Sequence, residues 1–538
     1  MAVELSEQQG VRLAVAGCGH GTLNDIYASV EYAREKKLWE SVDMLIVGGD
    51  FQSVRNLFDL NCVNMPMKYR HMGDFHEYYS GQRVAPVLTI FVGGNHEASN
   101  YLFELYFGGW VAPKIYYLGA ANILRFGPLR IMGMNGIDKS YDYRKPHHER
   151  LPYSESDLKS IYHVRELDVR KLLQVRTQVD IGLSHDWPKS VEWEGNYRQL
   201  FTFKPFLEED AKNGRLGSLP AQLVLGNLRP RYWFSAHLHC EYLANIHHDE
   251  INTMNQADWK PEWNKDEIDL DLDDDYTDAG PSKVPEDTRA ALPEAFRRVP
   301  DPPKATAEGA EKVIPNKTTR FLALDKFGEK RRFLRLSEVR ADNGVVAERP
   351  FKLMYDREWL AITRAYGLGE PIIVGDPNAQ VPRVKPLEPR AAAIDTCMLW
   401  LDQELSEADY VIPENFELTA PVYDKGNMYD ERYSHVKEYP NPQTATFCKL
   451  LDIPNPLEIS EPEIAARMAS GPTWMPPLRE RRTEFDSKHR GNQARGGFKA
   501  NRGGRGGQRG GGNRGRGGQR GGRGGGGNRG GYGGFNNG

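Results

Sequence analysis

Short apolar runs that end in glycine or polar residues recur through the first half of the chain. The run at 11–17, VRLAVAG, is followed by Ile26, Val30 and Ala33 at helical spacing. Apolar stretches of the same form lie at 43–50, 85–97, 179–186 and 231–239. Such stretches are typical of buried strands, and here they alternate with helical spacing. Residues 1–250 are therefore predicted to form one layered α/β unit.

The pattern changes after residue 250. The segment 251–315 holds the acidic run IDLDLDDDYTD and several prolines, so we expect a solvated linker that needs no specific partner. Apolar residues return in 319–327, 331–339 and 351–367. Residues 316–465 are predicted to form either a second folded unit or an extension packed on the first. Residues 466–538 approach RGG repeats through several prolines and are predicted to be disordered.

Charge divides the chain in the same way. The formal net charge of the 538 residues is −4, yet residues 491–538 contain nine Arg, one Lys and no acidic residue. Five cysteines in so long a chain do not make a disulfide framework and suit a reducing compartment. The sequence has no apolar run of about 18 residues or more, so no membrane span is expected. The polar, acidic first residues are not expected to act as a secretory signal.

Potential metal ligands follow five of the apolar runs. A single buried histidine is usually only hydrogen-bonded, and a single Gly-Asp is usually a turn. Five strand ends that each carry a nitrogen, oxygen or sulfur ligand are a much stronger signal, because open α/β sheets bind ligands at the carboxyl ends of their strands. Imidazole, carboxylate, amide and thiolate together suit Fe, Zn or Mn rather than Ca or Mg. The predicted ligands are Cys18, His20, Asp50, Asn95, His185, His237 and His239.

Local spacing gives an expectation for the geometry of these ligands. Paired glycines precede Asp50 and Asn95 and would let the backbone approach a central ion. Residues i and i+2 of a strand point the same way, so His237 and His239 would reach the same cluster if the strand continued. The same argument predicts that Cys18 and His20 point together.

The ordered series Gly-Asp, Gly-Asn-His-Glu, a single His and His-x-His resembles the metallophosphoesterase superfamily. The resemblance implies an αββα sandwich with two metals held between the sheets. It further implies that Asp50 bridges both ions and that Asn95, His185 and His237 complete one site, while His239 binds the other ion.

The first motif departs from that superfamily. It is normally Asp-x-His, whereas this chain has Cys18-Gly19-His20. A soft thiolate should favour Fe(II) or Zn over Mg or Mn, and could also leave that site partly empty. A damaged ligand in a decaying enzyme is the alternative interpretation.

Cys-x-His in this position also resembles a narrower group, the lariat debranching enzyme family. The resemblance implies a C-terminal debranching-enzyme domain. It also implies hydrolysis of the 2′–5′ phosphodiester at the branch point of excised intron lariats, and hence a nuclear location. The stretches that carry it are 92–119, 141–166, 183–190 and 232–239, with 319–327 and 355–365 for the C-terminal domain.

Two residues beside Asn95 have expected roles in that reaction. His96, as an imidazolium, would protonate the departing 2′ oxygen, or would only hydrogen-bond the phosphate. Glu97 is expected to orient a histidine. Asp50 is the residue expected to hold a metal pair.

The segment 137–166 interleaves basic and aromatic residues, a pattern that suits phosphates and stacked bases. The family resemblance implies a lariat-recognition loop here, and an ordinary solvated loop is the alternative. The residues predicted to bind substrate are Lys139, Tyr141, Tyr143, Arg144, Lys145, His147, His148 and Arg150.

The RGG tail predicts sequence-tolerant contact with RNA, although it could also serve only solubility. Two other functions stay open: a broad-specificity phosphatase, and a non-catalytic RNA-binding protein with a relict enzyme domain. The sequence identifies no protein partner.

Overall fold

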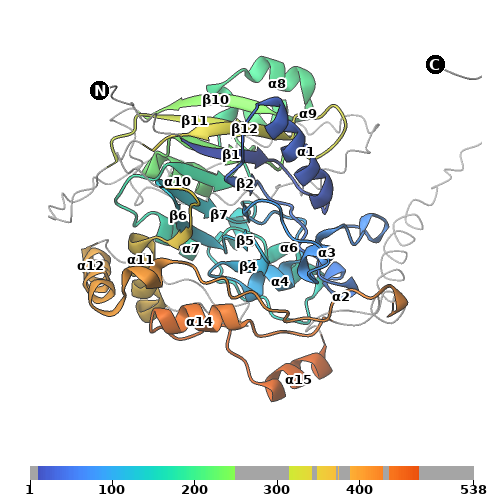
Figure 1. The fold of residues 1–538 in the computed structure, drawn as a ribbon, viewed down its shortest axis with the longest axis vertical. Helices are drawn as coiled ribbons and strands as arrows, with labels where there is room; N and C mark the ends of the chain where they lie inside the picture. The colour runs from blue at the N-terminus through green and yellow to red at the C-terminus, as the bar shows by residue number, and fades with distance from the viewer. Residues whose placement is uncertain are drawn as a thin grey trace, which may run out of the picture. The chain divides into compact units, whose positions relative to one another are not determined.

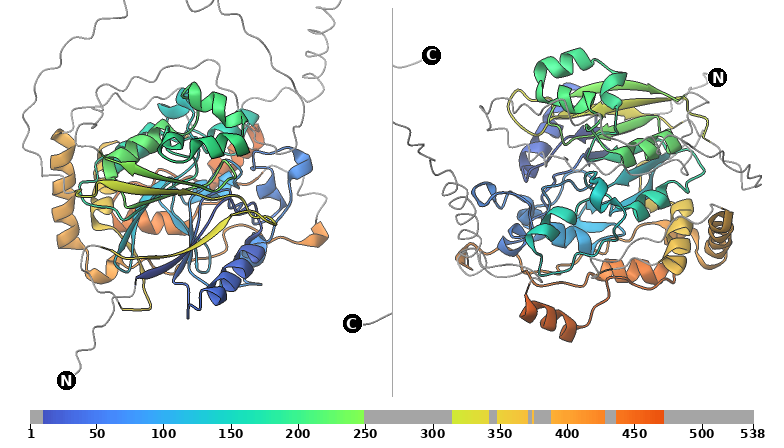
Figure 2. Two further views of the ribbon diagram at one scale, coloured as in Figure 1. Left: turned by 90° about the horizontal axis from the view of Figure 1, so that it is seen from above. Right: turned by 180° about the vertical axis from the view of Figure 1, so that it is seen from behind.

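Two β-sheets lie one upon the other at the centre of the fold, and helices cover their outer faces (Figures 1 and 2). This computed structural model describes residues 10–248, 314–341, 348–370, 374, 388–427 and 436–471. The described residues all belong to one compact unit. The predicted linker lies outside the described residues except for 314–315, and so does the predicted tail beyond residue 471.

The first sheet has the strand order β12-β1-β2-β3-β5-β4. Strands β1, β2, β3 and β5 run parallel to one another. At the two edges of the sheet, β12 pairs antiparallel with β1, and β4 pairs antiparallel with β5. The strands are β1 (Val11–Ala16), β2 (Met44–Val47), β3 (Thr89–Phe91), β4 (Gly109–Ala112), β5 (Ile115–Tyr117) and β12 (Leu334–Val339).

The second sheet has the order β10-β11-β9-β8-β7-β6-β13. Strands β7, β8, β9 and β11 are parallel, whereas β6, β10 and β13 are antiparallel to their partners. The strands are β6 (Ala121–Phe126), β7 (Leu129–Met134), β8 (Ile181–Ser184), β9 (Tyr232–Ser235), β10 (Tyr242–His247), β11 (Thr318–Ala323) and β13 (Leu353–Tyr355).

Alternating side chains of β1 explain how the layers are built. Leu13 and Val15 belong to the main core, which also contains residues of the second sheet, whereas Ala14 and Ala16 belong to a smaller core with α1 (Leu23–Lys36). Successive side chains of a strand point to opposite faces, so an uninterrupted apolar run is needed when both faces are covered. The predicted strand at 11–17 and the helix after it are confirmed.

Helices cover the outer faces of both sheets (Figure 2). Helix α1 contacts β12, helix α7 contacts β6, and α10 and α11 both contact α7. In the part of the chain that the structure describes, no helix is long and apolar enough to cross a membrane. The remaining bounds are α2 (Leu57–Leu60), α3 (Phe75–Tyr79), α4 (Ser99–Glu104), α7 (Glu166–Leu172), α8 (Tyr197–Phe203), α9 (Phe206–Lys212), α10 (Leu219–Leu228), α11 (Arg357–Gly369), α12 (Glu388–Glu404), α14 (Pro442–Leu450) and α15 (Glu461–Ser470).

Strands from the C-terminal part of the chain complete both sheets. β11 lies between β9 and β10, β12 pairs with β1, and β13 pairs with β6. A buried ion pair joins the same parts, since Arg130 Nη2 lies 2.7 Å from Asp356 Oδ1. Of the two alternatives predicted for residues 316–465, these pairings support the extension packed on the first unit.

The far end of that region differs from expectation in one respect. Helix α15 continues to Ser470, so residues 466–470 are helical although we expected disorder from 466. The helix buries Ile464, and this apolar contact explains why order persists beyond the predicted boundary.

Candidate metal centre

The predicted ligands lie in loops that leave the carboxyl ends of five parallel strands. Cys18 and His20 follow β1, Asp50 follows β2 and Asn95 follows β3 in the first sheet. In the second sheet, His185 follows β8, and His237 and His239 follow β9. The edge at which parallel strands end is the usual ligand-binding edge of an open α/β sheet.

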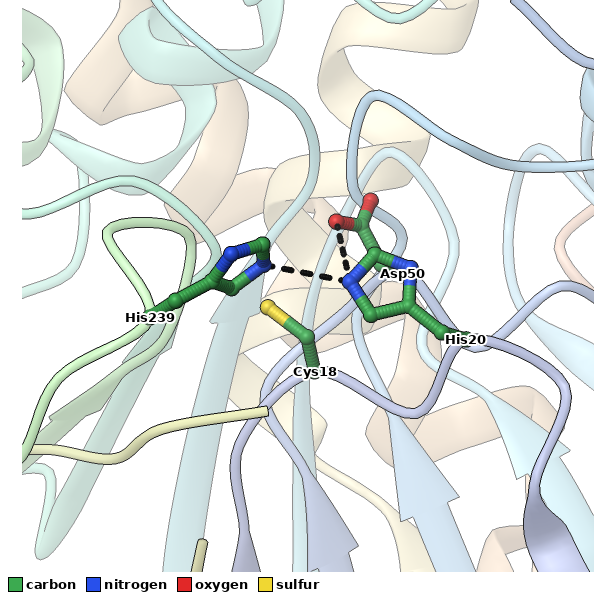
Figure 3. A group of neighbouring side chains, drawn as sticks. All are labelled: Cys18, His20, Asp50 and His239. Carbon is green, nitrogen blue, oxygen red and sulfur yellow. Dashed lines mark hydrogen bonds and ion pairs between the residues drawn. The ribbon is translucent and has the colours of Figure 1, made fainter. Parts of the chain in front are cut away.

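Four of these residues form one compact group (Figure 3). Ligand atoms of Cys18, His20, Asp50 and His239 all lie within 4.8 Å of one another. His20 Nε2 is 3.1 Å from His239 Nε2 and 3.8 Å from Asp50 Oδ2. In Figure 3 the sulfur of Cys18 points into the space between the two rings. We call this group the cysteine half-site.

The other ligands lie around His185, which is close to the second carboxylate oxygen of Asp50. His185 Nε2 lies 3.5 Å from Asp50 Oδ1 and 3.2 Å from Asn95 Oδ1. The ring of His237 is 5.0 Å from the ring of His185, centroid to centroid. This group is called the asparagine half-site below. Asp50 thus touches both half-sites, one with each oxygen, as expected of a residue that holds a metal pair.

The backbone reaches this geometry by a route that strand periodicity did not predict. β1 ends at Ala16 and β9 ends at Ser235, so neither His-x-His nor Cys-x-His lies in a strand. Three histidines of these motifs have left-handed backbone angles, with φ of 44° at His20, 60° at His237 and 47° at His239. The strand continuation on which the i and i+2 expectation depended is therefore absent. Cys18 and His20 nevertheless lie together in the cysteine half-site, as expected. His237 and His239 turn to different half-sites instead of pointing the same way.

Two glycines make room for the cluster, as predicted. A Cβ on Gly49 would lie 2.1 Å from His185 Nδ1, and one on Gly94 would lie 2.2 Å from Asp50 Oδ1. Gly49 also has a φ of 120°, a conformation that other residues rarely adopt. Either side chain would displace a ligand.

Burial keeps histidines of the centre in the neutral form, which is the form that binds metals. It lowers the pKa of His20 to about 4 and that of His237 to about 3, so both rings are neutral near pH 7. Burial alone would raise the pKa of Asp50, but His185, His96 and His20 outweigh it and hold that pKa well below its usual range. Burial, followed by the charge of Asp50, raises the pKa of the Cys18 thiol.

This donor set fits divalent metal ions. Neutral imidazoles and an ionised carboxylate are the forms that bind metals, and a thiol binds after losing its proton. Two neutral ring nitrogens that face each other at 3.1 Å can share one hydrogen at most, and a cation between such groups satisfies both lone pairs.

Backbone contacts hold the ligands from behind. His185 Nδ1 lies 2.9 Å from the carbonyl oxygen of Gly48, which keeps the hydrogen on Nδ1 and turns Nε2 toward Asp50. Glu97 accepts hydrogen bonds from the backbone N–H groups of Phe51, Gln52 and Gly94 at 2.7, 2.8 and 3.1 Å. The expectation that Glu97 orients a histidine was wrong, because its carboxylate ties the loop of Asp50 to the loop of Asn95.

His96 lies beside the cysteine half-site. Its ring centroid is 5.9 Å from that of His20, and its backbone N–H donates to Asp50 Oδ1 at 2.9 Å. His96 Nδ1 is 2.9 Å from the carbonyl oxygen of Asn64, so Nδ1 carries a hydrogen and Nε2 is the atom left for a substrate. The sequence did not point to Asn64.

The segment 137–166 contains two short helices, α5 (Ser140–Tyr143) and α6 (Glu155–Ser160). Of the residues predicted to bind substrate there, Tyr143 is 3% exposed and belongs to the main core. His147 is 7% exposed, and its Nε2 lies 2.8 Å from Asp168 Oδ2. Neither ring offers a face for stacking, so the predicted role does not fit these two residues.

The other six predicted residues differ in their exposure to solvent. Tyr141 is 42% exposed, and the side chains of Arg144 and Lys145 are 40% and 41% exposed. A cavity of about 640 Å³ opens beside them. Lys139 is buried, His148 lies 3.7 Å from Glu149, and Arg150 lies 2.7 Å from Glu438. The cavity is lined by residues that include Tyr141, Lys145, His148, Arg150 and Arg467.

Comparison with known proteins covers most of the chain. Residues 11–241 match the family model described as calcineurin-like phosphoesterase, and residues 316–456 match the one described as the C-terminal domain of lariat debranching enzyme. A lariat debranching enzyme of Arabidopsis thaliana is 36% identical over 451 residues, which are 84% of this chain and 88% of that protein. The one of Drosophila melanogaster is 40% identical and covers 83% and 78% of the two chains. That of Homo sapiens is 39% identical and covers 82% and 69%.

Proposed function

Because this chain belongs to the lariat debranching enzyme family, we propose that it hydrolyses the 2′–5′ phosphodiester at the branch point of excised intron lariats. The observation that carries the proposal is the convergence of seven predicted ligands into two half-sites that share Asp50. The product would be a linear intron RNA, and we propose the nucleus as the place of reaction because introns are excised there.

Cys18, His20 and His239 would hold one metal, Asn95, His185 and His237 a second, and Asp50 would bridge them. Bound divalent metals neutralise the charge of a phosphodiester and lower the pKa of water to roughly 7. The softness of the Cys18 thiolate supports Fe(II) or Zn at the cysteine half-site, with Mn as a substitute.

His96 would act on the leaving group. With Nδ1 held by the carbonyl of Asn64, Nε2 is the atom that would donate a proton to the departing 2′ oxygen. A positioned acid of this kind typically contributes 10²–10⁴-fold to a rate. The exposed side chains of Tyr141 and Lys145, which line the cavity, and the exposed side chain of Arg144 support the binding of branched RNA by this segment.

The RGG tail would add RNA affinity without touching the chemical step. Residues 491–538 of the tail hold nine arginines and no acidic residue, which supports contacts with phosphates that weaken as salt rises. Tethering of this kind raises the effective concentration of RNA near the centre.

The test compares three substrates with the full chain after loading with Fe, Zn or Mn in the absence of oxygen. We expect cleavage of branched RNA and little action on linear 3′–5′ RNA or an aryl phosphate. His237→Ala should lower the cleavage rate at least about a hundredfold, because it removes a buried ligand. His71→Ala, an exposed histidine outside the centre, is the matched control and should keep full activity.

Each alternative function has its own outcome in this test. Preferential action on the aryl phosphate would identify a broad-specificity phosphatase. Binding of RNA without hydrolysis by either the wild type or His237→Ala would identify a relict enzyme. Efficient cleavage of linear RNA would overturn the proposed specificity.

A further inference from the structure

The loop between β11 and β12 lies against both motifs that build the cysteine half-site. The backbone N–H of Leu324 donates to the carbonyl of Ser235 at 3.1 Å, at the end of β9. On the other side, Phe327 N–H donates to the carbonyl of Cys18 at 3.4 Å, and Gly17 N–H donates to the carbonyl of Phe333 at 2.9 Å. The loop 324–333 therefore connects the segment that carries His239 with the segment that carries Cys18.

Lys326 is placed in the middle of these contacts. Leu324, two residues before it, bonds to the end of β9, and Phe327, the next residue, bonds to Cys18. The N–H of Lys326 itself donates to Asp325 Oδ1 at 2.7 Å. Asp325 is 7% exposed, and its Oδ1 also accepts a hydrogen bond from Arg331 Nη1 at 2.8 Å. The backbone of Lys326 is thus fixed from three directions, although the residue comes from the C-terminal part of the chain.

The charge of Lys326 acts on the ligands of this half-site. Burial and then Asp50 raise the pKa of Cys18, and Lys326 opposes that rise. Burial lowers the pKa of His20 to about 4, and Lys326 adds to that effect against Asp50. On the other side, the pKa of His237 is lowered by burial and by charges that include Lys139.

A branch nucleotide creates a need for extra cations. It carries phosphodiesters on its 2′, 3′ and 5′ oxygens, whereas a nucleotide within linear RNA carries only two. When the 2′ ester occupies the metal centre, two further negative charges must lie within a few ångströms of it. A lysine ammonium is a compact charge that suits a phosphate.

We propose that Lys326 binds one of the two uncleaved phosphates of the branch nucleotide, beside the cysteine half-site. This inference rests on the proposed function and gives the C-terminal region a part in substrate selection. A nucleotide of linear RNA with one ester at the metal centre has only one other phosphate, whereas the branch nucleotide has two. Lys326 therefore favours branched over linear substrates.

The test uses the metal-loaded full chain and three branched RNAs. One has all phosphates, and the other two carry a neutral methylphosphonate at the 3′ or the 5′ diester of the branch nucleotide. Lys326→Ala should lower kcat/KM for the unmodified RNA about ten- to a hundredfold, the usual effect of losing one hydrogen bond to a charged group. On one methylphosphonate RNA the same substitution should cost less than about threefold, because the partner charge is already absent.

Two further variants separate this contact from a general effect on the loop. Lys326→Arg keeps the charge and should retain most activity, and Lys330→Ala removes an exposed charge from the same loop and should change little. An equal penalty for Lys326→Ala on all three RNAs would overturn the inference, as would no penalty at all.

The inference can fail independently of the proposed function. Equilibrium binding of the same three RNAs to wild type and Lys326→Ala tests the contact without any hydrolysis. A wild type that binds but does not cleave branched RNA contradicts the proposed function alone. If Lys326→Ala weakens the binding of all three RNAs equally, or of none of them, the role of Lys326 is contradicted.

Discussion

Cys18 presents a thiol where the other ligands are imidazoles, an amide and a carboxylate. It is 1% exposed, and the backbone N–H of His237 donates to its sulfur at 3.3 Å. Burial keeps the free thiol protonated, so binding of a metal must release that proton. The choice of metal at the cysteine half-site should therefore depend on this one sulfur atom.

Cys18→Asp should shift the metal preference of the enzyme. A carboxylate is a harder ligand, so activity with Mn should rise relative to activity with Zn by about tenfold or more. The measurement is debranching after chelation and reloading with each metal in turn. Cys448→Ser, a buried cysteine in α14, is the control that should leave the ranking unchanged. An unaltered ranking in Cys18→Asp would show that the thiol does not select the metal.

The convergence of the candidate ligands could be predicted at this scale, whereas the hydrogen-bond partners of individual side chains could not. Each ligand stands after an apolar run, so a local pattern is enough to find it. His147 looked like a base-stacking residue because its neighbours are basic and aromatic. Its real partner, Asp168, lies 21 residues away in α7, and only the fold brings the two together.

The short 3₁₀ helix at Val191–Glu194 is held against β10 by one hydrogen bond. Tyr242 donates through its hydroxyl to the backbone carbonyl of Glu192 at 2.5 Å. The Glu192 side chain is 2% exposed, and its Oε2 has no hydrogen-bond partner among the described residues. Burial raises the pKa of Glu192 from 4.5 to about 7.

This carboxyl makes folding depend on pH. Between pH 4.5 and 7 the folded chain keeps a proton on Glu192 that the unfolded chain has lost, so stability falls as pH rises through that window. Glu192→Gln should raise the free energy of unfolding by about 1–3 kcal/mol at pH 8 and by little at pH 5. Urea unfolding at both pH values measures this, with the exposed Glu194→Gln as control. An equal gain at both pH values would contradict it.

Strands that end in a marked polar motif could be predicted from their apolar runs, and strands without such a motif were missed. β1, β2, β3, β8 and β9 were expected because each ends in a marked polar motif. β5 has only three residues, and unlike the equally short β3 it is not followed by a marked polar motif. The hairpin of β6 and β7 turns at Gly127, whose φ is 55°, and the Gly-Pro pair there was the available signal.

At the scale of the whole molecule, the C-terminal part is built into both sheets. β11 separates β10 from β9, with Ala323 opposite Ser235 and Tyr242. The sequence left open whether this region folds by itself, because such pairings join segments that are far apart in the chain. The hydrophobic pattern of a segment indicates that it forms a strand, but it does not indicate which distant strand that strand pairs with.

Splitting the chain tests this arrangement. A fragment 1–250 alone should be poorly soluble, because it lacks the three strands that pair with β1, β6, β9 and β10. Co-expression with a fragment 314–471 should restore a soluble pair that copurifies and binds metal. Removal of residues 475–538 is the control and should leave the melting temperature within a few degrees, since every described strand pairing lies before them. A stable, monodisperse 1–250 fragment would contradict this prediction.

The position of β11 has a consequence for synthesis on the ribosome. Chains emerge from their N-terminus, so β9 and β10 leave the exit tunnel well before the strand that must lie between them. Until residues 318–323 follow, the nascent chain exposes two unpaired strand edges next to the motif of His237 and His239. We therefore expect the metal centre to reach its final form only after residues 318–323 have been synthesised, and protection by chaperones to be most needed during that interval.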